Sequence, residues 1–248
     1  MIWPNDVFLS PPIDNHLLRQ KEEECLLVDL GIQDYQESLR TQARIVEKRK
    51  HQRVPDCLLF VEYGHTITVG RSGKKDHLLA SNQELKEKKI ELFHTDRGGD
   101  VTYHGPGQLI AYPILDLKSL RRDIDWYLRT LEACIIATLE DYGIASKTIS
   151  GATGVWVKEE KIAAIGIRMS QWVTSHGIAL NINTELDYFN TIIPCGIQGK
   201  GVTSVAKVLN KTFLDPYPIK LSFCRHFEQL FERCLRSDPK EGDPILWI

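Results

Sequence analysis

The sequence predicts an α+β fold in which a mixed, largely antiparallel sheet is flanked by helices. Predicted strands outnumber predicted helices, and several strands follow one another with only short turns between them. A hairpin is indicated where Gly154–Val157 and Ile162–Arg168 are joined by a short charged segment. Strands and helices do not alternate regularly, which disfavours a doubly wound parallel sheet.

The predicted strands are short runs rich in branched and aromatic residues. Leu58–Tyr63 and Leu109–Leu117 are the clearest, and Pro113 places the second run near an edge or a bulge. The other strands are predicted at Cys25–Leu30, Thr66–Gly70, Ile90–Phe93 and Gly177–Asn183.

The predicted helices show apolar residues three and four positions apart. One runs from Gln33 to about Lys50, with a basic end that suits the helix dipole. The longest runs from Ile124 to Tyr142, with Asp123 or Asp125 as its N-cap and Gly143 at its end. Further helices are predicted at Asn82–Lys88, at Ser204–Asn210 and from Pro218 onward, the last with Cys224 and Cys234 on its apolar face.

The length of 248 residues permits one large domain or two small ones. We find no internal repeat, low-complexity tract or clear linker. The sequence therefore predicts a single domain over residues 25–236, preceded by an irregular extension, 1–24, and followed by a tail, 237–248.

Composition excludes several classes of function. The formal net charge of -2 gives no general attraction to nucleic acid, and no apolar run approaches the roughly 20 residues of a membrane span. The N-terminus lacks the pattern of a secretory signal, and the six cysteines form no C-x-x-C pair. The cysteine pattern leads us to expect a reducing, cytoplasmic setting. We expect no metal site, because the eight histidines are dispersed along the sequence.

Cys195 stands apart from the other cysteines, which lie in apolar surroundings and are expected in the core. It lies between Pro194 and Gly196, ahead of a second glycine-rich segment. A free thiol titrates near ~8.5, so useful nucleophilicity needs a neighbouring base or cation. The candidate partners are His104, His176 and Lys161.

Lys161 begins an otherwise apolar strand. Strict alternation would put its side chain on the face of Ala163, Ile165 and Ile167. If that face is inward, desolvation lowers the pKa of the ammonium and makes Lys161 a proton acceptor for a thiol. The alternative is an exposed lysine that ends the turn after Glu159.

Four glycines lie within the segment from Arg97 to Gln108. Such a segment can direct backbone N–H groups at one carbonyl oxygen or oxyanion, or it can simply be a tight structural turn. The small residues of Ala163–Gly166 and Gly177–Ala179 leave two interpretations open as well. They form a slot for an alkyl chain, or they allow close packing between strands and helices.

The run Arg97–Pro113 resembles the signature of lipoyl(octanoyl) transferases. The likeness spans roughly Cys25 to Phe231 and includes His65–Arg71, Lys161–Gly166, His176–Asn181 and Pro194–Ile197. It implies the fold of biotin and lipoate protein ligases. It also implies transfer of an octanoyl group from acyl carrier protein to a lysine on lipoyl domains of 2-oxoacid dehydrogenase complexes or on glycine cleavage H protein, without metal or organic cofactor.

The resemblance also implies roles for individual residues. Cys195 would carry the acyl group as a thioester, and Lys161 would lower the pKa of that thiol and later help to deprotonate the incoming amine. The acyl substrate would be lined by Arg97, Gly98, Gly99, Asp100, Val101, Thr102, Tyr103, His104, Ala164, Ile165, Gly166, Gly177, Ile178 and Ala179.

Three other functions compete with acyl transfer. An ATP-dependent lipoate or biotin ligase on the same fold would need no cysteine nucleophile, so Cys195 argues against it. A non-catalytic module would bind acylated carrier domains without forming an adduct. A thioesterase would release free octanoate.

Overall fold

A computed structural model of the protein describes residues 23–194 and 199–237. In chain order the elements are β1 Glu23–Gln33, α1 Tyr35–Lys50, β2 Asp56–Tyr63, β3 Thr66–Val69, η1 Lys75–His77, α2 Asn82–Glu87, β4 Glu91–His94, β5 Val101–His104, β6 Gln108–Ile114, α3 Ile124–Glu140, β7 Lys147–Ile149, β8 Ala152–Val157, β9 Glu160–Ser170, β10 Val173–Asn181, η2 Leu186–Thr191, β11 Gly201–Val202, α4 Val205–Val208, α5 Pro216–Phe231 and β12 Arg233–Arg236.

Two sheets organise this part of the chain. The larger has the order β12-β1-β2-β6-β10-β9-β8-β7, with β11 paired to β9 beside this path. The smaller has the order β4-β3-β5. Strand β1 is parallel to β2 and β12, whereas β2–β6, β6–β10, β10–β9, β9–β8 and β8–β7 are antiparallel. The predicted α+β class with a mixed, largely antiparallel sheet is therefore confirmed.

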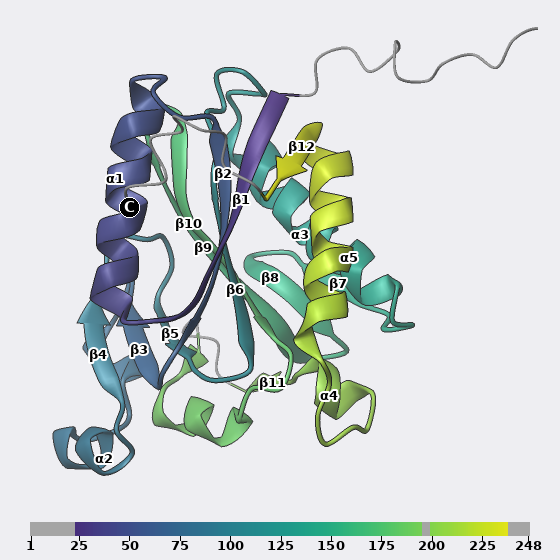
Figure 1. Cartoon of the computed structure of the whole chain (residues 1–248). Coiled ribbons are helices and arrows are strands. Elements are labelled where there is room, and N and C mark those ends of the chain that lie inside the picture. Colours follow the sequence, from purple (N-terminus) through teal and green to yellow (C-terminus); the bar gives the residue numbers. More distant parts are fainter. Residues whose placement is uncertain (1–22, 195–198, 238–248) are drawn as a thin grey trace, which may run out of the picture.

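Helices cover both faces of the larger sheet (Figure 1). Helix α1 packs on one face over a core that includes Tyr35, Ile45 and Tyr63. Helices α3 and α5 pack side by side on the other face, over the largest core cluster. The smaller sheet and η2 enclose a third cluster. The strands between these layers carry the residues of the site described below.

Helix α3 illustrates how the sequence determines an element. Leu131, Cys134, Ile135 and Leu139 recur at helical spacing, and all four are fully or almost fully buried. Asp123 is the N-cap, with its carboxylate accepting from the N–H of Trp126 at 2.9 Å. None of the helices in the described residues is both long and apolar enough to cross a membrane.

The end of the chain differs from the prediction in two ways. Helix α5 begins at Pro216 rather than Pro218, because Asp215 caps it by accepting from the N–H of Tyr217. Cys234 does not lie on that helix. Glu232 adopts a left-handed conformation that ends α5, and Cys234 belongs to strand β12, which was not predicted.

The predicted flanking segments lie mostly outside the described residues. Residues 1–22 and 238–248 are not described. Glu23 and Glu24 belong to β1, so this strand begins inside the predicted extension. The division into one domain with two flanking segments stays a prediction.

A buried ionic cluster joins elements that are far apart in the sequence. The carboxylate of Asp56 accepts from Nε of Arg49 at 2.7 Å and from Nε of Arg233 at 2.8 Å. It also accepts from the N–H of Asp116 at 2.8 Å. Asp56 and both arginines are buried, so the cluster ties α1, β2 and β12 together.

Replacing Asp56 with alanine leaves two buried guanidinium groups without their carboxylate. We expect the free energy of unfolding to fall by about 3–5 kcal/mol, measured by urea denaturation. The control is Asp29→Ala, which removes a partly exposed carboxylate paired with Lys220 and should cost at most about 1 kcal/mol. Equal losses in the two variants would contradict the stabilising role of the buried cluster.

Candidate active site

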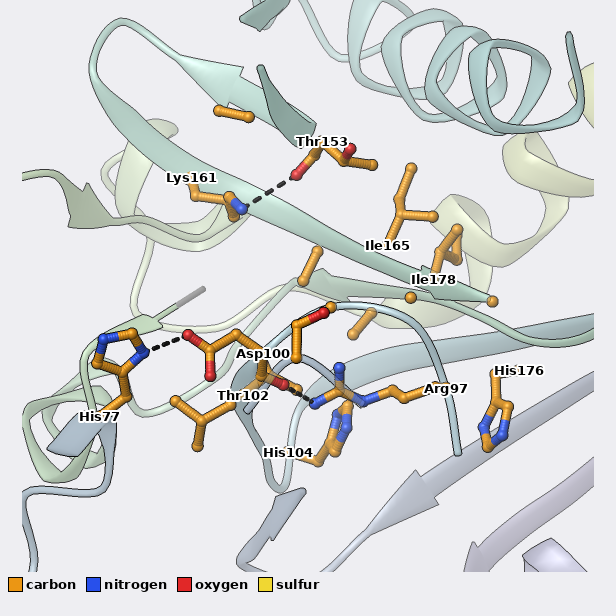
Figure 2. A pocket seen from close by; sticks show the side chains of 18 of the residues that line it. His77, Arg97, Asp100, Thr102, His104, Thr153, Lys161, Ile165, His176 and Ile178 are labelled. Carbon is orange, nitrogen blue, oxygen red and sulfur yellow. Dashed lines mark hydrogen bonds and ion pairs between the residues drawn. The ribbon is translucent and has the colours of Figure 1, made fainter. Parts of the chain in front are cut away.

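A cavity of about 410 Å³ lies against β9 and β10, and we call it the central cavity (Figure 2). A volume of this size is typical of sites for small ligands. Twelve of the fourteen residues predicted to line the acyl substrate lie on the wall of this cavity: Arg97, Gly99, Asp100, Val101, Thr102, His104, Ala164, Ile165, Gly166, Gly177, Ile178 and Ala179.

The other two predicted residues, Gly98 and Tyr103, do not line the central cavity. The N–H of Gly98 donates to the carbonyl of Ile167 at 2.7 Å, so this amide fastens the loop to β9. Tyr103 is buried in the third core cluster, and its hydroxyl lies 2.7 Å from Nδ1 of His65. Its ring packs instead against the rings of Tyr188 and Phe189 in η2.

Arg97 shapes the loop that covers the cavity. Its buried guanidinium donates to the carbonyls of Thr68 and Asp100, both at 2.7 Å, and to the carbonyl of Gly98 at 3.0 Å. These bonds fix several peptide planes at once, because guanidinium presents a rigid fork of donors. The segment from Arg97 to Gln108 thus begins with a loop, residues 97–100, that the Arg97 side chain braces. Strand β5 and a short turn follow, and β6 begins at Gln108.

Two glycines let this loop approach its neighbours. A Cβ on Gly70 would lie 2.4 Å from the carbonyl oxygen of Gly99, and one on Gly166 would lie 2.9 Å from that of Gly98. Only glycine fits at such distances. Gly166 therefore permits close packing against the loop, and Ala164 and Ala179 line the cavity. That this space takes an alkyl chain stays a prediction.

Lys161 is buried, so it is not the exposed end of a turn. The prediction that Lys161 and Ala163 share one face of the strand is wrong. Trp156 of β8 pairs with Lys161, but the preceding residue, Val155, pairs with Ala163, so Ile162 is the extra residue of a β-bulge in β9. As a result Ile162 and Ala163 both join the core beside α3, whereas Lys161 lines the central cavity together with Ala164.

The Lys161 side chain is held by groups from β8. Its Nζ donates to the carbonyl of Thr153 at 3.1 Å, as Figure 2 shows. It also lies 4.7 Å from the centre of the Trp156 ring, where a cation is attracted to the π face. The side chain is therefore positioned against the wall of the cavity.

Cys195 and the next three residues lie outside the described residues. Both flanking segments lie near Lys161. Pro194 and Val202 line a small cavity of about 10 Å³ together with Lys161, Ala164 and Ala179. On the far side of the gap, β11 pairs with β9 so that Val202 lies opposite Lys161.

The two candidate histidines have other partners. Nδ1 of His104 donates to Oε1 of Gln108 at 2.8 Å, and its Nε2 lies 3.3 Å from the hydroxyl of Thr68. Nε2 of His176 lies 2.9 Å from a carboxylate oxygen of Asp96. Neither histidine lines the small cavity beside Pro194. Of the three candidates for the partner of Cys195, Lys161 alone shares that cavity.

A chain of buried hydrogen bonds connects the start of β6 to Lys161. Nε2 of Gln108 donates to Oδ1 of Asn181 at 2.9 Å, and Nδ2 of Asn181 donates to the carbonyl of Thr203 at 3.0 Å. The N–H of Thr203 in turn donates to the carbonyl of Lys161 at 3.0 Å. These bonds hold β6, β10 and the segment after the gap in one arrangement.

Burial lowers the pKa of His104 to about 4, from an ordinary value near ~6.5. Below pH ~6.5 the unfolded chain binds a proton that the folded protein does not. Stability is therefore full above that pH and is lost as the pH falls toward 4, by up to roughly 3 kcal/mol from this one group. Urea denaturation between pH 7 and 4 should show this loss. His104→Gln should remove that part of the loss, and a variant with an unchanged pH profile would contradict the assignment.

The sequence did not indicate several residues that line the central cavity: Ser72, His77, Tyr112, Gly151, Ala152 and Thr153. Nδ1 of His77 is hydrogen-bonded to the Asp100 carboxylate at one side of the cavity (Figure 2). The residues are far apart in the sequence, so no local pattern relates them. Within the described residues, no group of three His, Cys, Asp or Glu side chains is arranged to hold a metal ion.

Comparison with known proteins places this chain in a family. The family model of the lipoyl protein ligase A/B catalytic domain matches residues 34–227. An octanoyltransferase from Solibacter usitatus is 50% identical over 208 residues, which cover 84% of this chain and 93% of that protein. One from Christiangramia forsetii is 43% identical over 230 residues, covering 86% of this chain and 98% of the relative.

Solved structures agree on the fold. A protein from T. acidophilum with bound lipoic acid has a TM-score of 0.72 at 17% identity, covering 90% of this chain and 93% of that one. Lipoate-protein ligase A bound with ATP has a TM-score of 0.70 at 17% identity, covering 90% and 92%. The chain belongs to the lipoyl protein ligase A/B catalytic domain family and, within it, to the octanoyltransferases.

Proposed function

We propose that the protein transfers an octanoyl group from octanoyl-acyl carrier protein to a specific lysine of lipoyl domains, through a thioester on Cys195. The observation that carries this proposal is the position of Lys161. Its buried amine lies on the wall of the central cavity and beside both segments that flank Cys195. The relatives named octanoyltransferase support the choice of acyl group and reaction.

In the first half-reaction, the thiolate of Cys195 attacks the thioester carbonyl of the donor. A carbon–sulfur bond forms to the enzyme, and a tetrahedral oxyanion develops. The oxyanion then collapses, the carbon–sulfur bond to the carrier breaks, and the carrier thiolate leaves. Lys161 takes the thiol proton of Cys195 at the start and returns a proton to the departing thiolate.

The braced loop supports stabilisation of the oxyanion. Arg97 fixes the peptide planes of this loop, and Gly99, Asp100 and Val101 line the central cavity. We propose that backbone N–H groups of the segment from Arg97 to Gln108 donate to the developing oxyanion, apart from the N–H of Gly98, which is already bonded to Ile167.

In the second half-reaction, the neutral amine of the acceptor lysine attacks the acyl-enzyme. A carbon–nitrogen bond forms, the thiolate of Cys195 leaves, and the amide nitrogen loses a proton to Lys161. The acceptors we propose are lipoyl domains of 2-oxoacid dehydrogenase complexes and the glycine cleavage H protein. We expect the reaction in the cytoplasm, where cysteine stays reduced, with no metal or organic cofactor.

The test is incubation of the protein with octanoyl-acyl carrier protein and an apo lipoyl domain, without ATP or magnesium. Intact mass spectrometry should show octanoylation of the lipoyl domain, and peptide mapping should place it on one lysine. A requirement for ATP and free octanoate would indicate a ligase. Release of octanoate without acceptor modification would indicate a thioesterase, and the absence of any mass change would leave only binding.

A further inference from the structure

A second cavity has a volume of about 640 Å³. It lies between α1 and residues 94–96 at the end of β4, beside the last residues of β9 and the first residues of β10. We call it the α1 groove. Leu39, Ala43 and Val46 of α1 form its apolar wall. Within the described residues, His176 is the only one that lines both the α1 groove and the central cavity. Its side chain therefore stands where the two spaces approach each other.

Several contacts fix the His176 ring in this place. The residue is 4% exposed, and Nε2 lies 2.9 Å from Oδ1 of Asp96, which is also paired with Arg168. The backbone N–H of His176 donates to Oε1 of Gln42 on α1 at 3.0 Å. The Tyr112 ring packs against it edge to face, with centroids 6.2 Å apart. A ring held by so many partners is a rigid wall.

The positions of the lining residues indicate how an acyl chain would be oriented in the central cavity. Lys161 lies toward one end and His176 toward the other, with Ile165 and Ile178 between them (Figure 2). Under the proposed function the reacting carbonyl lies at the Lys161 end. The hydrocarbon tail then runs along the apolar middle of the cavity and ends at His176.

We propose that His176 sets the maximum length of the acyl chain by closing the central cavity against the α1 groove. This inference rests on the proposed function, because it takes the central cavity as the acyl site. Removal of the ring joins the two cavities. The terminal methylenes of a longer chain then pass into the groove and contact Leu39, Ala43 and Val46. Each methylene that becomes fully buried there raises affinity by up to about fourfold.

The variant that tests this is His176→Gly. His176 has a φ of 56°, a left-handed conformation in which glycine is unstrained, so the backbone tolerates the change. Calorimetry should measure the affinities of octanoate and dodecanoate for the wild type and for the variant. We expect the dodecanoate-to-octanoate affinity ratio to rise at least ~10-fold in the variant. Transfer from dodecanoyl carrier protein should improve in parallel, mainly through KM.

Two further variants control the result. His176→Asn also tolerates a left-handed conformation and can donate to Asp96, so it should give a smaller rise in the ratio even if the glycine variant folds poorly. Leu39→Ala enlarges the α1 groove without opening the wall and should leave the ratio unchanged. An unchanged ratio in folded His176 variants would overturn the inference. Failure of the proposed function would be seen separately from failure of this inference. In that case the wild type would transfer no octanoyl group, whereas the dodecanoate-to-octanoate affinity ratio would still show whether His176 limits the length of the cavity.

Discussion

Cys195→Ser should form no octanoyl adduct with octanoyl-acyl carrier protein, and its rate of transfer to the lipoyl domain should fall at least ~10³-fold. A serine hydroxyl at neutral pH is far less nucleophilic than a thiolate, and the Lys161 amine is suited to deprotonating a thiol rather than an alcohol. Intact mass spectrometry of the enzyme measures the adduct, and an octanoylation assay of the acceptor measures transfer.

The matched control is Cys234→Ser, which changes the partly exposed cysteine of β12. This variant should form the adduct and transfer the acyl group like the wild type. Full transfer by Cys195→Ser would show that the acyl group passes directly from donor to acceptor, and the covalent mechanism would have to be abandoned.

Lys161→Met should slow both half-reactions by roughly 10²–10⁴-fold, the usual contribution of a positioned acid–base group. Methionine fills a similar volume but cannot accept or donate the proton. The carbonyl of Thr153 loses its donor, which should cost about 1–3 kcal/mol of stability and leave the protein folded. Rapid-quench kinetics of adduct formation and of its decay with acceptor measure the two steps separately.

Lys200→Met is the control for this prediction. The Lys200 ammonium also lies over the Trp156 ring, at 5.5 Å from its centre, but it is paired with Glu159 on the surface and does not line the central cavity. Its loss should leave both half-reactions close to wild type. If the two lysine variants behaved alike, a general effect of positive charge would replace the specific role of Lys161.

Much of the fold could be predicted from the sequence, because local patterns encode it. Helix α3 follows from apolar spacing and the Asp123 cap, and the hairpin of β8 and β9 follows from two apolar runs around a charged turn. Strand β12 could not be predicted. It has only four residues, two of them arginine, and it exists because Arg233 reaches Asp56 and the strand pairs with β1.

The site could be predicted in part. The glycine-rich loop and the small residues of β9 and β10 stand out in the sequence, and most of them line the central cavity. The burial of Lys161 was left open because it depends on a bulge at Ile162, and no periodic pattern reveals a bulge. The contributions of His77 and Tyr112 depend on contacts between strands and loops that are distant in the sequence.

The most direct test of the central claim is single turnover of the isolated octanoyl-enzyme. The adduct is purified away from the donor, mixed with apo lipoyl domain and quenched over time, and the acyl group is followed from Cys195 to the acceptor lysine. We predict transfer with a rate constant at least equal to kcat. An adduct that stays on the enzyme, or that is consumed more slowly than the enzyme turns over, would contradict a mechanism that passes through it.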